Sequence, residues 1–87
     1  MVKMAFRSTA KNELDRLPRA LRRMLIAGCG EVFDDWAIGK LLSGRLSGFR
    51  VHRVGTYRIL YEVKQSSNVE IVAIGHRSEI YERMKGR

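Results

Sequence analysis

Residues 48–81 read GFRVHRVGTYRILYEVKQSSNVEIVAIGHRSEIY, and this stretch decides the fold. It contains three runs rich in β-branched and aromatic residues, at about 49–54, 57–64 and 69–76, separated by two short turns. Runs of this length and composition between turn residues are typical of β-strands joined as hairpins. The sequence therefore predicts three antiparallel strands, around which the rest of the chain is arranged.

The first turn fixes the register of two strands. In residues 54–57, VGTY, glycine occupies the first of the two central positions, which favours a type II′ turn. A two-residue loop places Arg53 opposite Arg58 and Val51 opposite Leu60. The two arginines repel each other, and a phosphate between them would offset this repulsion through paired hydrogen bonds. Two solvated arginines near a hairpin tip are the simpler interpretation of the same spacing.

The second turn sets the register of the third strand. Residues 65–68, QSSN, are expected to form a four-residue loop with Lys64 opposite Val69. The same register places Gly75 opposite Arg58, where the missing side chain would leave room for a phosphate to approach the guanidinium. It also places His76 opposite Tyr57.

Two more residues are expected at this edge of the sheet. Arg77 leaves the third strand beside the arginine pair. Tyr81 lies in the segment SEIYERM, which predicts one or two helical turns capped by Ser78, so that its phenol can fold back to the same end. The predicted site therefore comprises Arg53, Arg58, Arg77 and Tyr81.

Alternation along the strands predicts two faces. The face that should receive the N-terminal helices comprises Tyr57, Ile59, Tyr61, Val63, Val72, Ile74 and His76. His76 is expected to be structural there. The other face comprises Val51, Leu60, Ile71 and Ala73, with the arginine pair at its end, and needs only partial cover.

Length and composition limit the architecture. With 87 residues, 45% of them hydrophobic and 30% charged, the chain suits one domain with a modest core, and residues 1–87 are assigned to a single domain. Its apolar runs are short and it begins with a strand-like alternation, so we expect no signal peptide or membrane span, and a cytoplasmic location. The one cysteine, Cys29, is expected to be a small buried hydrophobe.

The charge balance points to a polyanionic partner. Seventeen Lys and Arg against nine Asp and Glu give a net charge of +8. A field of this sign favours nucleic acid through counterion release. The charges alternate with strand residues instead of forming a tail, which indicates a structured binding surface. An acidic protein would be attracted by the same positive charge and is the alternative partner.

The N-terminal part is expected to form a strand and two helices. Val2–Arg7 alternates apolar and polar residues, as an edge strand would. Ser8 and Thr9 are candidate N-caps for a helix that buries Ala10, Leu14 and Leu17. Pro18 ends this helix and can begin a second one that reaches about Asp35. The apolar face of the second helix comprises Leu21, Met24, Leu25, Gly28, Val32 and Trp36.

A connector links the helices to the strands. Residues 37–48, AIGKLLSGRLSG, are rich in glycine and serine and predict no regular element. Leucines anchor the connector, and its two cations, Lys40 and Arg45, are expected to face the basic edge or solvent.

Three blocks of the chain resemble the RelE/ParE superfamily of bacterial and archaeal toxins. They are the connector with Lys40, Leu42, Gly44, Leu46 and Gly48, the block RVGTYRILYEV at 53–63 and the block GHRSEIY at 75–81. The resemblance covers nearly the whole chain. It implies an α+β fold in which two N-terminal helices pack on a mainly antiparallel four-stranded sheet, with a short C-terminal helix.

The resemblance also implies a function. Superfamily members are toxins of type II toxin–antitoxin systems, each covered by a cognate antitoxin; the RelE branch cuts mRNA at the ribosome, whereas the ParE branch inhibits DNA gyrase. Residue by residue, Arg58, Arg77 and Tyr81 match positions that the RelE branch uses at the scissile phosphate and the stacked base. We therefore expect a ribosome-dependent mRNA endonuclease. A gyrase inhibitor without nuclease activity and an inactive member are the alternatives.

One position departs from the superfamily pattern. Val51 stands where members commonly carry a basic residue, and Arg50 and His52 alternate to the other face unless a bulge rotates the strand. The candidate RNA-binding residues are Lys40, Arg45, Arg50 and His52.

The residue types favour chemistry without a metal. The acidic residues are scattered and the two histidines lack ligand spacing, so we expect no metal and no small-molecule cofactor. RNA cleavage then needs a proton acceptor, cations that stabilise the phosphorane and a donor for the leaving oxygen. The arginines are predicted to stabilise the transition state, because arginine does not readily act as a base. Tyr81 would stack or donate, and His52 is the imidazole available for proton transfer.

Overall fold

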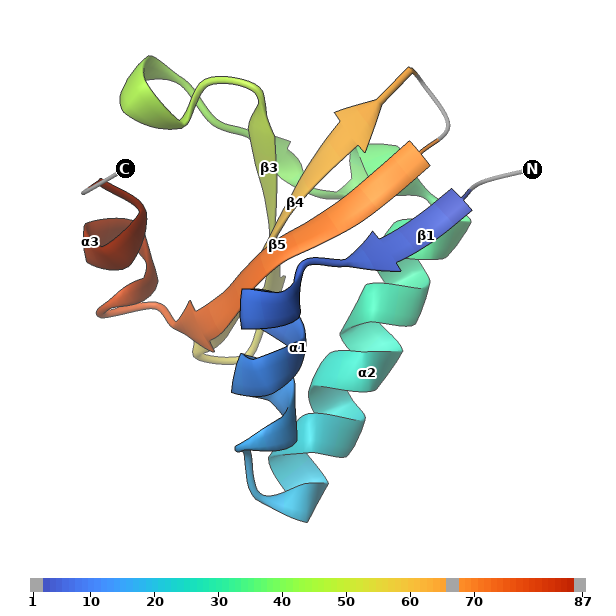
Figure 1. The fold of residues 1–87 in the computed structure, drawn as a ribbon, viewed down its shortest axis with the longest axis vertical. Helices are drawn as coiled ribbons and strands as arrows, with labels where there is room; N and C mark the ends of the chain where they lie inside the picture. Colours follow the sequence, from blue (N-terminus) through green and yellow to red (C-terminus); the bar gives the residue numbers. More distant parts are fainter. Residues whose placement is uncertain (1–2, 66–67, 86–87) are drawn as a thin grey trace.

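A computed structural model describes residues 3–65 and 68–85. Its centre is a five-stranded sheet with the strand order β1-β5-β4-β3-β2 (Figure 1). The strands are β1 Lys3–Phe6, β2 Lys40–Leu41, β3 Phe49–Val54, β4 Tyr57–Lys64 and β5 Asn68–His76. The helices are α1 Ser8–Asp15, α2 Arg19–Asp34 and α3 Ile80–Lys85, with short 3-10 helices η1 Trp36–Ile38 and η2 Gly44–Leu46. None of the described helices is long and apolar enough to span a membrane.

The predicted α+β class and the mainly antiparallel sheet are confirmed. β1 is parallel to β5, and the other three pairings are antiparallel. The sequence predicts four strands, and the fifth is β2, two residues inside the connector that pair with Val51 and Arg50 of β3. A strand of two residues is too short to show an alternating pattern in the sequence. It forms because it can pair with the edge of β3, so the sequence does not predict it.

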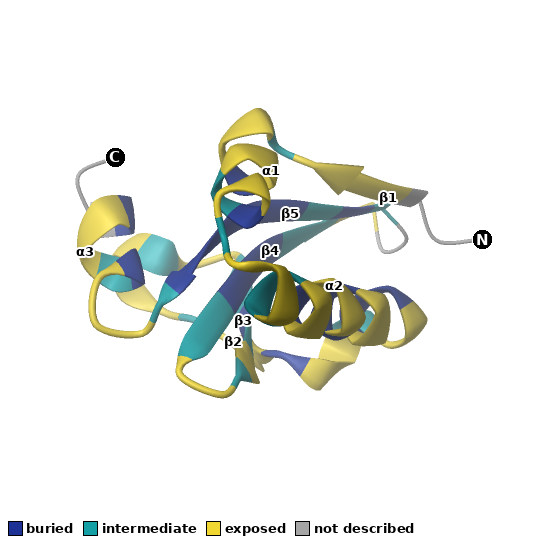
Figure 2. Ribbon diagram, turned by 90° about the horizontal axis from the view of Figure 1, so that it is seen from below, coloured by how far each residue is buried: buried dark blue, intermediate teal, exposed yellow. Residues whose placement is uncertain are grey.

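Helices cover both faces of the sheet (Figures 1 and 2). On one face, α1 and α2 bury Ala10, Leu14, Leu25, Cys29, Val32 and Phe33 against Ile59, Tyr61, Val69, Ile71 and Ile74. On the other face, Ile80 and Met84 of α3 pack with Val51, Leu60, Val72 and Ala73, next to Leu42, Leu46, Phe49 and Tyr81. We call this second face the α3 face.

A bulge changes the predicted register of β5. The pairs Arg53–Arg58, Val51–Leu60, Arg58–Gly75 and Tyr57–His76 are confirmed. Beyond Leu60 the register shifts, so that Lys64 pairs with Asn68 and not with Val69, and Val72 has no partner in β4. The extra residue reverses the alternation. Ile71 therefore faces the helices and Val72 lies on the α3 face, opposite to the prediction for both residues. The predicted 65–68 turn includes residues 66–67, which lie outside the described residues.

The predicted helix caps are wrong. Arg7 holds the N-cap position of α1 without a side-chain cap, and the Thr9 hydroxyl lies 3.5 Å from the Val72 carbonyl. Pro18 is the residue before α2, not its first residue. α3 begins at Ile80, and the Ser78 hydroxyl lies 2.7 Å from Nδ1 of His76. The hydroxyl groups of Thr9 and Ser78 thus have other partners, which compete with capping.

Some residues of the predicted apolar faces are exposed. Met4 is 55% and Phe6 38% exposed, and Phe6 packs edge-on against Phe33 of α2 with ring centroids 6.1 Å apart. Val2, predicted on the same face, lies outside the described residues. Met24 is 44% exposed, and Trp36 lies beyond the end of α2, in η1. Helical spacing identifies a face of the helix but not how far the sheet extends beneath it.

Cys29 is predicted to be chemically inert in the folded protein. Its side chain is buried in α2, as the sequence predicts, and burial raises its pKa to about 12. Because the thiolate is the reactive form, a disulfide reagent at pH 8 should label native protein on the order of 100-fold more slowly than protein in guanidinium chloride. Labelling can be followed by absorbance. Equal rates in the two solvents would contradict the buried position.

Candidate phosphate-binding site

The β3–β4 turn organises the candidate site. Gly55 has φ +60°, as the first central residue of a type II′ turn requires. Arg53 and Arg58 are directly paired across the two strands. Nη1 of Arg58 donates to the carbonyl oxygens of Gly55, at 3.0 Å, and Tyr57, at 2.9 Å. The turn carbonyls therefore hold the Arg58 guanidinium beside its repelling neighbour.

Arg77 lies at the same hairpin tip. Its backbone N–H donates to the Thr56 carbonyl at 2.8 Å, so the chain leaving β5 is bound to the turn. Arg53 and Arg77 are exposed and Arg58 is half-buried. Within the described part of the chain, none of these three arginines forms an ion pair. Three unneutralised guanidinium groups around one turn make a local excess of positive charge.

Tyr81 and Lys40 lie on the same face of the sheet as Arg53 and Arg58. Tyr81, in α3, is half-buried against the apolar residues of the α3 face. Lys40 of β2 pairs with Val51, and the alternation along β3 gives it the same face as Arg53. Arg45 lies in η2, beside Leu46, which packs on that face. The α3 face thus carries the candidates Lys40, Arg53, Arg58 and Tyr81.

Arg50 and His52 are not brought to this group. Nη1 of Arg50 donates to the Gly39 carbonyl at 2.8 Å, and its guanidinium lies 5.2 Å from the Trp36 ring centroid. Nε2 of His52 lies 3.1 Å from Oε1 of Glu31 in α2. Both side chains therefore contact the helical layer, and no bulge in β3 turns them towards the α3 face.

Arg50 belongs to a buried network that fixes the start of β2. The Tyr61 hydroxyl donates to the Trp36 carbonyl at 2.7 Å and accepts the Gly39 N–H at 2.8 Å. Burial raises the pKa of Tyr61, and so keeps the phenol protonated. These bonds join η1 and Gly39 to β4. They thereby hold Lys40, which follows Gly39, at the edge of β3.

The space beside Gly75 is not open. A Cβ at Gly75 would lie 2.1 Å from Nη2 of Arg83, so the side chain of Arg83 occupies the room that the sequence assigns to a phosphate. Arg83 is not among the site residues that the sequence predicts. The spacing of Ile80, Arg83 and Met84 is a helical i, i+3, i+4 pattern, which puts an arginine next to the buried face of α3 and requires a partner for it.

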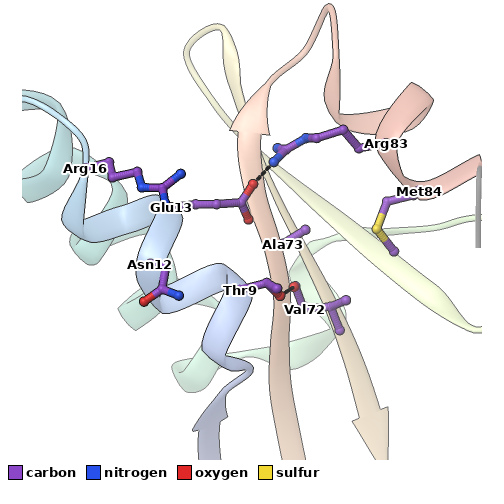
Figure 3. Close-up of a pocket in the computed structure, with 8 residues that line it drawn as sticks. All are labelled: Thr9, Asn12, Glu13, Arg16, Val72, Ala73, Arg83 and Met84. Atoms are coloured by element: carbon purple, nitrogen blue, oxygen red, sulfur yellow. Dashed lines mark hydrogen bonds and ion pairs between the residues drawn. The ribbon is translucent and has the colours of Figure 1, made fainter.

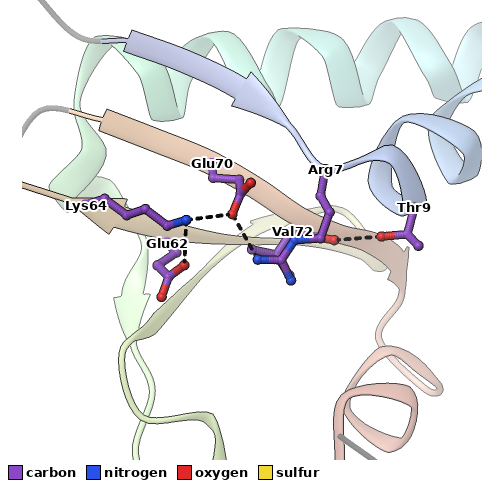
Figure 4. Close-up of polar contacts among 6 residues, drawn as sticks. All are labelled: Arg7, Thr9, Glu62, Lys64, Glu70 and Val72. Carbon is purple, nitrogen blue, oxygen red and sulfur yellow. Dashed lines mark hydrogen bonds and ion pairs between the residues drawn. The ribbon is translucent and has the colours of Figure 1, made fainter.

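The opposite end of the α3 face is neutralised (Figure 4). Glu62 and Glu70 are paired across β4 and β5, and Nζ of Lys64 lies 3.8 Å and 3.3 Å from their carboxylates. Nη2 of Arg7 donates to Glu70 at 2.9 Å. The Arg7 hydrogen bond lowers the pKa of Glu70 despite its partial burial. The excess of positive charge at the hairpin tip therefore does not extend to this end of the α3 face.

Glu70 should make stability depend on pH. Its folded pKa lies below the value of an unfolded glutamate, about 4.3, so its contribution is present above that pH and is lost as the pH falls through the folded pKa. Glu70→Gln is expected to lower the free energy of unfolding at pH 7 by about 0.2–1 kcal/mol. The difference from wild type should vanish at low pH. Urea titrations across this range, with the exposed Glu79→Gln as control, measure it; a pH-independent difference would contradict the ionic origin.

The described residues contain no group of three His, Cys, Asp or Glu side chains that could hold a metal ion. The candidate residues on the α3 face supply guanidinium and ammonium groups and a phenol. Guanidinium groups bind phosphate oxygens in a fork geometry that suits the backbone of a nucleic acid.

Known proteins resemble this chain in sequence and in fold. The family model for the ParE toxin of the type II toxin-antitoxin system parDE matches residues 4–81. Toxin RelG of Mycobacterium tuberculosis is 36% identical in an alignment 84 positions long, which covers 90% of this chain and 93% of that protein.

Solved structures agree with these matches. The toxin-antitoxin complex RelBE2 from Mycobacterium tuberculosis contains a chain that matches with a TM-score of 0.79 and 30% identity, over 91% of this chain and 97% of that one. The isolated E. coli RelE toxin matches with a TM-score of 0.74 over 100% of this chain and 98% of that one. At 23% identity, this second likeness shows the fold alone.

Proposed function

Because the chain belongs to the ParE toxin family, within the RelE/ParE superfamily, we propose that it is a toxin that cuts mRNA on the ribosome and is held inactive by a cognate antitoxin. The observation that supports this proposal best is the group of Arg53, Arg58 and Arg77 around one hairpin tip, without ion-pair partners in the described residues. Such a group is suited to a phosphate that gains negative charge during the reaction.

The proposed chemistry is transition-state stabilisation. The 2′-hydroxyl loses its proton to solvent water and its oxygen bonds to the neighbouring phosphorus, while the bond from phosphorus to the 5′-oxygen breaks. Charge builds on the non-bridging oxygens during this step, and guanidinium groups that are already in place stabilise it. Tyr81 would stack on a base or donate a proton to the leaving 5′-oxygen, and Lys40 and Arg45 would bind the adjacent backbone. His52 is assigned no proton transfer, because its ring contacts Glu31 on the helical side.

That position of His52 favours a second candidate function. A nuclease without metal benefits from a positioned proton acceptor, and the imidazole expected for this role lies on the wrong side of β3. A basic surface that binds an acidic patch on DNA gyrase needs no proton acceptor. The ParE-type activity, inhibition of gyrase without RNA cleavage, is therefore the alternative.

One experiment separates the two functions. The toxin is induced in growing cells, and primer extension is carried out on a translated mRNA and on the same mRNA with its start codon removed. Cuts in phase with the codons of the translated mRNA alone are the expected result. Induction of the DNA damage response without such cuts would replace the proposal with gyrase inhibition.

The antitoxin is testable independently. A small protein encoded beside this chain should co-purify with it, through an acidic or amphipathic segment that covers the basic hairpin tip. A chain that is harmless and soluble when overproduced alone would contradict the proposal of an antitoxin-controlled toxin.

A further inference from the structure

One edge of β5 is completed by side chains instead of a strand. β1 pairs with β5 only as far as Phe6 and Ile71, so in the described part of the chain the following residues of β5 have no strand on that side. The Ile74 N–H donates to Oε1 of Glu13 in α1 at 3.2 Å, and the Ile74 carbonyl accepts from Nη2 of Arg83 in α3 at 3.2 Å. A single residue of the sheet is therefore bonded to both flanking helices.

Glu13 and Arg83 also form an ion pair with each other across this edge (Figure 3). The Glu13 side chain is only 18% exposed and the Arg83 side chain 47%. Removing one partner of a half-buried pair leaves the other desolvated and uncompensated, so the pair acts as one unit. It joins α1, which lies on the face opposite to α3, to α3 itself.

Gly75 makes this contact possible. Its Cβ would collide with Nη2 of Arg83 at 2.1 Å, so the guanidinium lies against bare backbone, at the residue that pairs with Arg58. A helix of six residues has little stability of its own. α3 therefore depends on its anchors, which are the packing of Ile80 and Met84 and the ion pair to Glu13.

We propose that Glu13, Arg83 and Gly75 form a clamp that fixes α3 and thereby positions Tyr81 on the face of the sheet that also carries Arg53 and Arg58. Tyr81 lies between the two anchors, one residue after Ile80 and two before Arg83. Glu13 is then a positioning residue for the site although it belongs to α1. The effect on RNA cleavage rests on the proposed function, whereas the attachment of α3 does not.

The first test measures the clamp without any activity. Glu13→Gln keeps an oxygen for the Ile74 N–H but removes the charge that Arg83 requires. Asp15→Asn, an exposed position in the same helix, removes the same charge away from the clamp. Hydrogen exchange of the Arg83 amide, which donates to the Glu79 carbonyl at 3.1 Å, reports on α3. We expect roughly 10-fold faster exchange in Glu13→Gln and no change in Asp15→Asn. Unchanged exchange in Glu13→Gln would overturn the clamp.

A second variant, Gly75→Ala, tests the clamp by displacing Arg83 instead of altering Glu13. Gly75→Ala leaves every charge in place but displaces the Arg83 guanidinium. It should accelerate exchange of the Arg83 amide. The double variant Glu13→Gln/Gly75→Ala should exchange no faster than the faster of the two single variants, because both substitutions act through Arg83. Thermal melting checks that each variant is folded. Additive effects on exchange would show two independent contacts and contradict a single clamp.

The third test asks whether the clamp acts through Tyr81. A displaced residue at a reacting group typically costs up to about 100-fold in rate, so Glu13→Gln should lower kcat for ribosome-dependent cleavage by about 10- to 100-fold with KM nearly unchanged. In a Tyr81→Ala background, Glu13→Gln should cause no further loss. A full additional loss there would overturn the positioning role. No effect of Tyr81→Ala alone would refute the role of Tyr81 in the proposed function, and the exchange rates would still decide the clamp.

Discussion

Arg58→Ala is expected to abolish growth inhibition while the protein still folds and still binds its antitoxin. Arg58 is fixed mid-site by its pairing with Arg53 and by two hydrogen bonds to turn carbonyls. Both bonds use Nη1, which leaves the remaining N–H groups of the fork for a phosphate. Losing one preorganised transition-state contact typically costs about 3–4 kcal/mol, or roughly 100- to 1000-fold in rate.

Growth after induction and RNA cleavage in a translation extract measure this effect. Arg77→Ala and Tyr81→Phe should be weaker, in that order, because Arg77 is more exposed than Arg58 and the Tyr81 change keeps the ring. Lys11→Ala removes one positive charge from an exposed position of α1 and should leave toxicity intact. Full toxicity of Arg58→Ala would refute the phosphate site and favour the gyrase alternative.

Gly39→Ala is expected to cause the largest loss of stability. Gly39 is buried, and a Cβ there would lie 2.3 Å from the hydroxyl and 2.8 Å from Cε1 of Tyr61, whose ring is fully buried. The ring has no room to retreat, and its bonds to Gly39 and to the Trp36 carbonyl would be disturbed together. Overpacking and broken buried hydrogen bonds together cost about 2–4 kcal/mol. For a domain of this size the melting temperature should fall by roughly 10–25 °C.

Gly30→Ala is the matched control. Gly30 is exposed within α2, and a Cβ there would meet nothing within 4 Å. Alanine favours the helix over glycine by about 0.5–1 kcal/mol, so this variant should melt slightly higher than wild type. Thermal unfolding followed by circular dichroism compares the two variants. Similar melting temperatures for Gly39→Ala and wild type would mean that the Tyr61 network does not hold the connector.

The sequence by itself determined the elements whose signals are local. Gly55 selects the turn, the turn sets Arg53 opposite Arg58, and period-2 alternation gives β3, β4 and β5 within a residue of their bounds. The apolar spacing in α2 likewise identified most of its buried residues. These features depend on neighbours a few residues apart, so they can be read along the chain. For the same reason the sequence correctly placed Arg53, Arg58 and Arg77 at one hairpin tip, although their roles remain proposals.

Only the tertiary structure decided which side chains are available at that tip. Arg50 and His52 belong to the same strand as Arg53, but Gly39, Trp36 and Glu31 lie where they can bind them, and those partners are 11 to 21 residues away. The bulge at Val72, the two residues of β2 and the Arg83 guanidinium beside Gly75 have the same origin. Each depends on a contact between different elements and on how the elements pack over the two faces of the sheet. A local pattern carries no information about such contacts, because it specifies the face of one element and not the partner that packs against it.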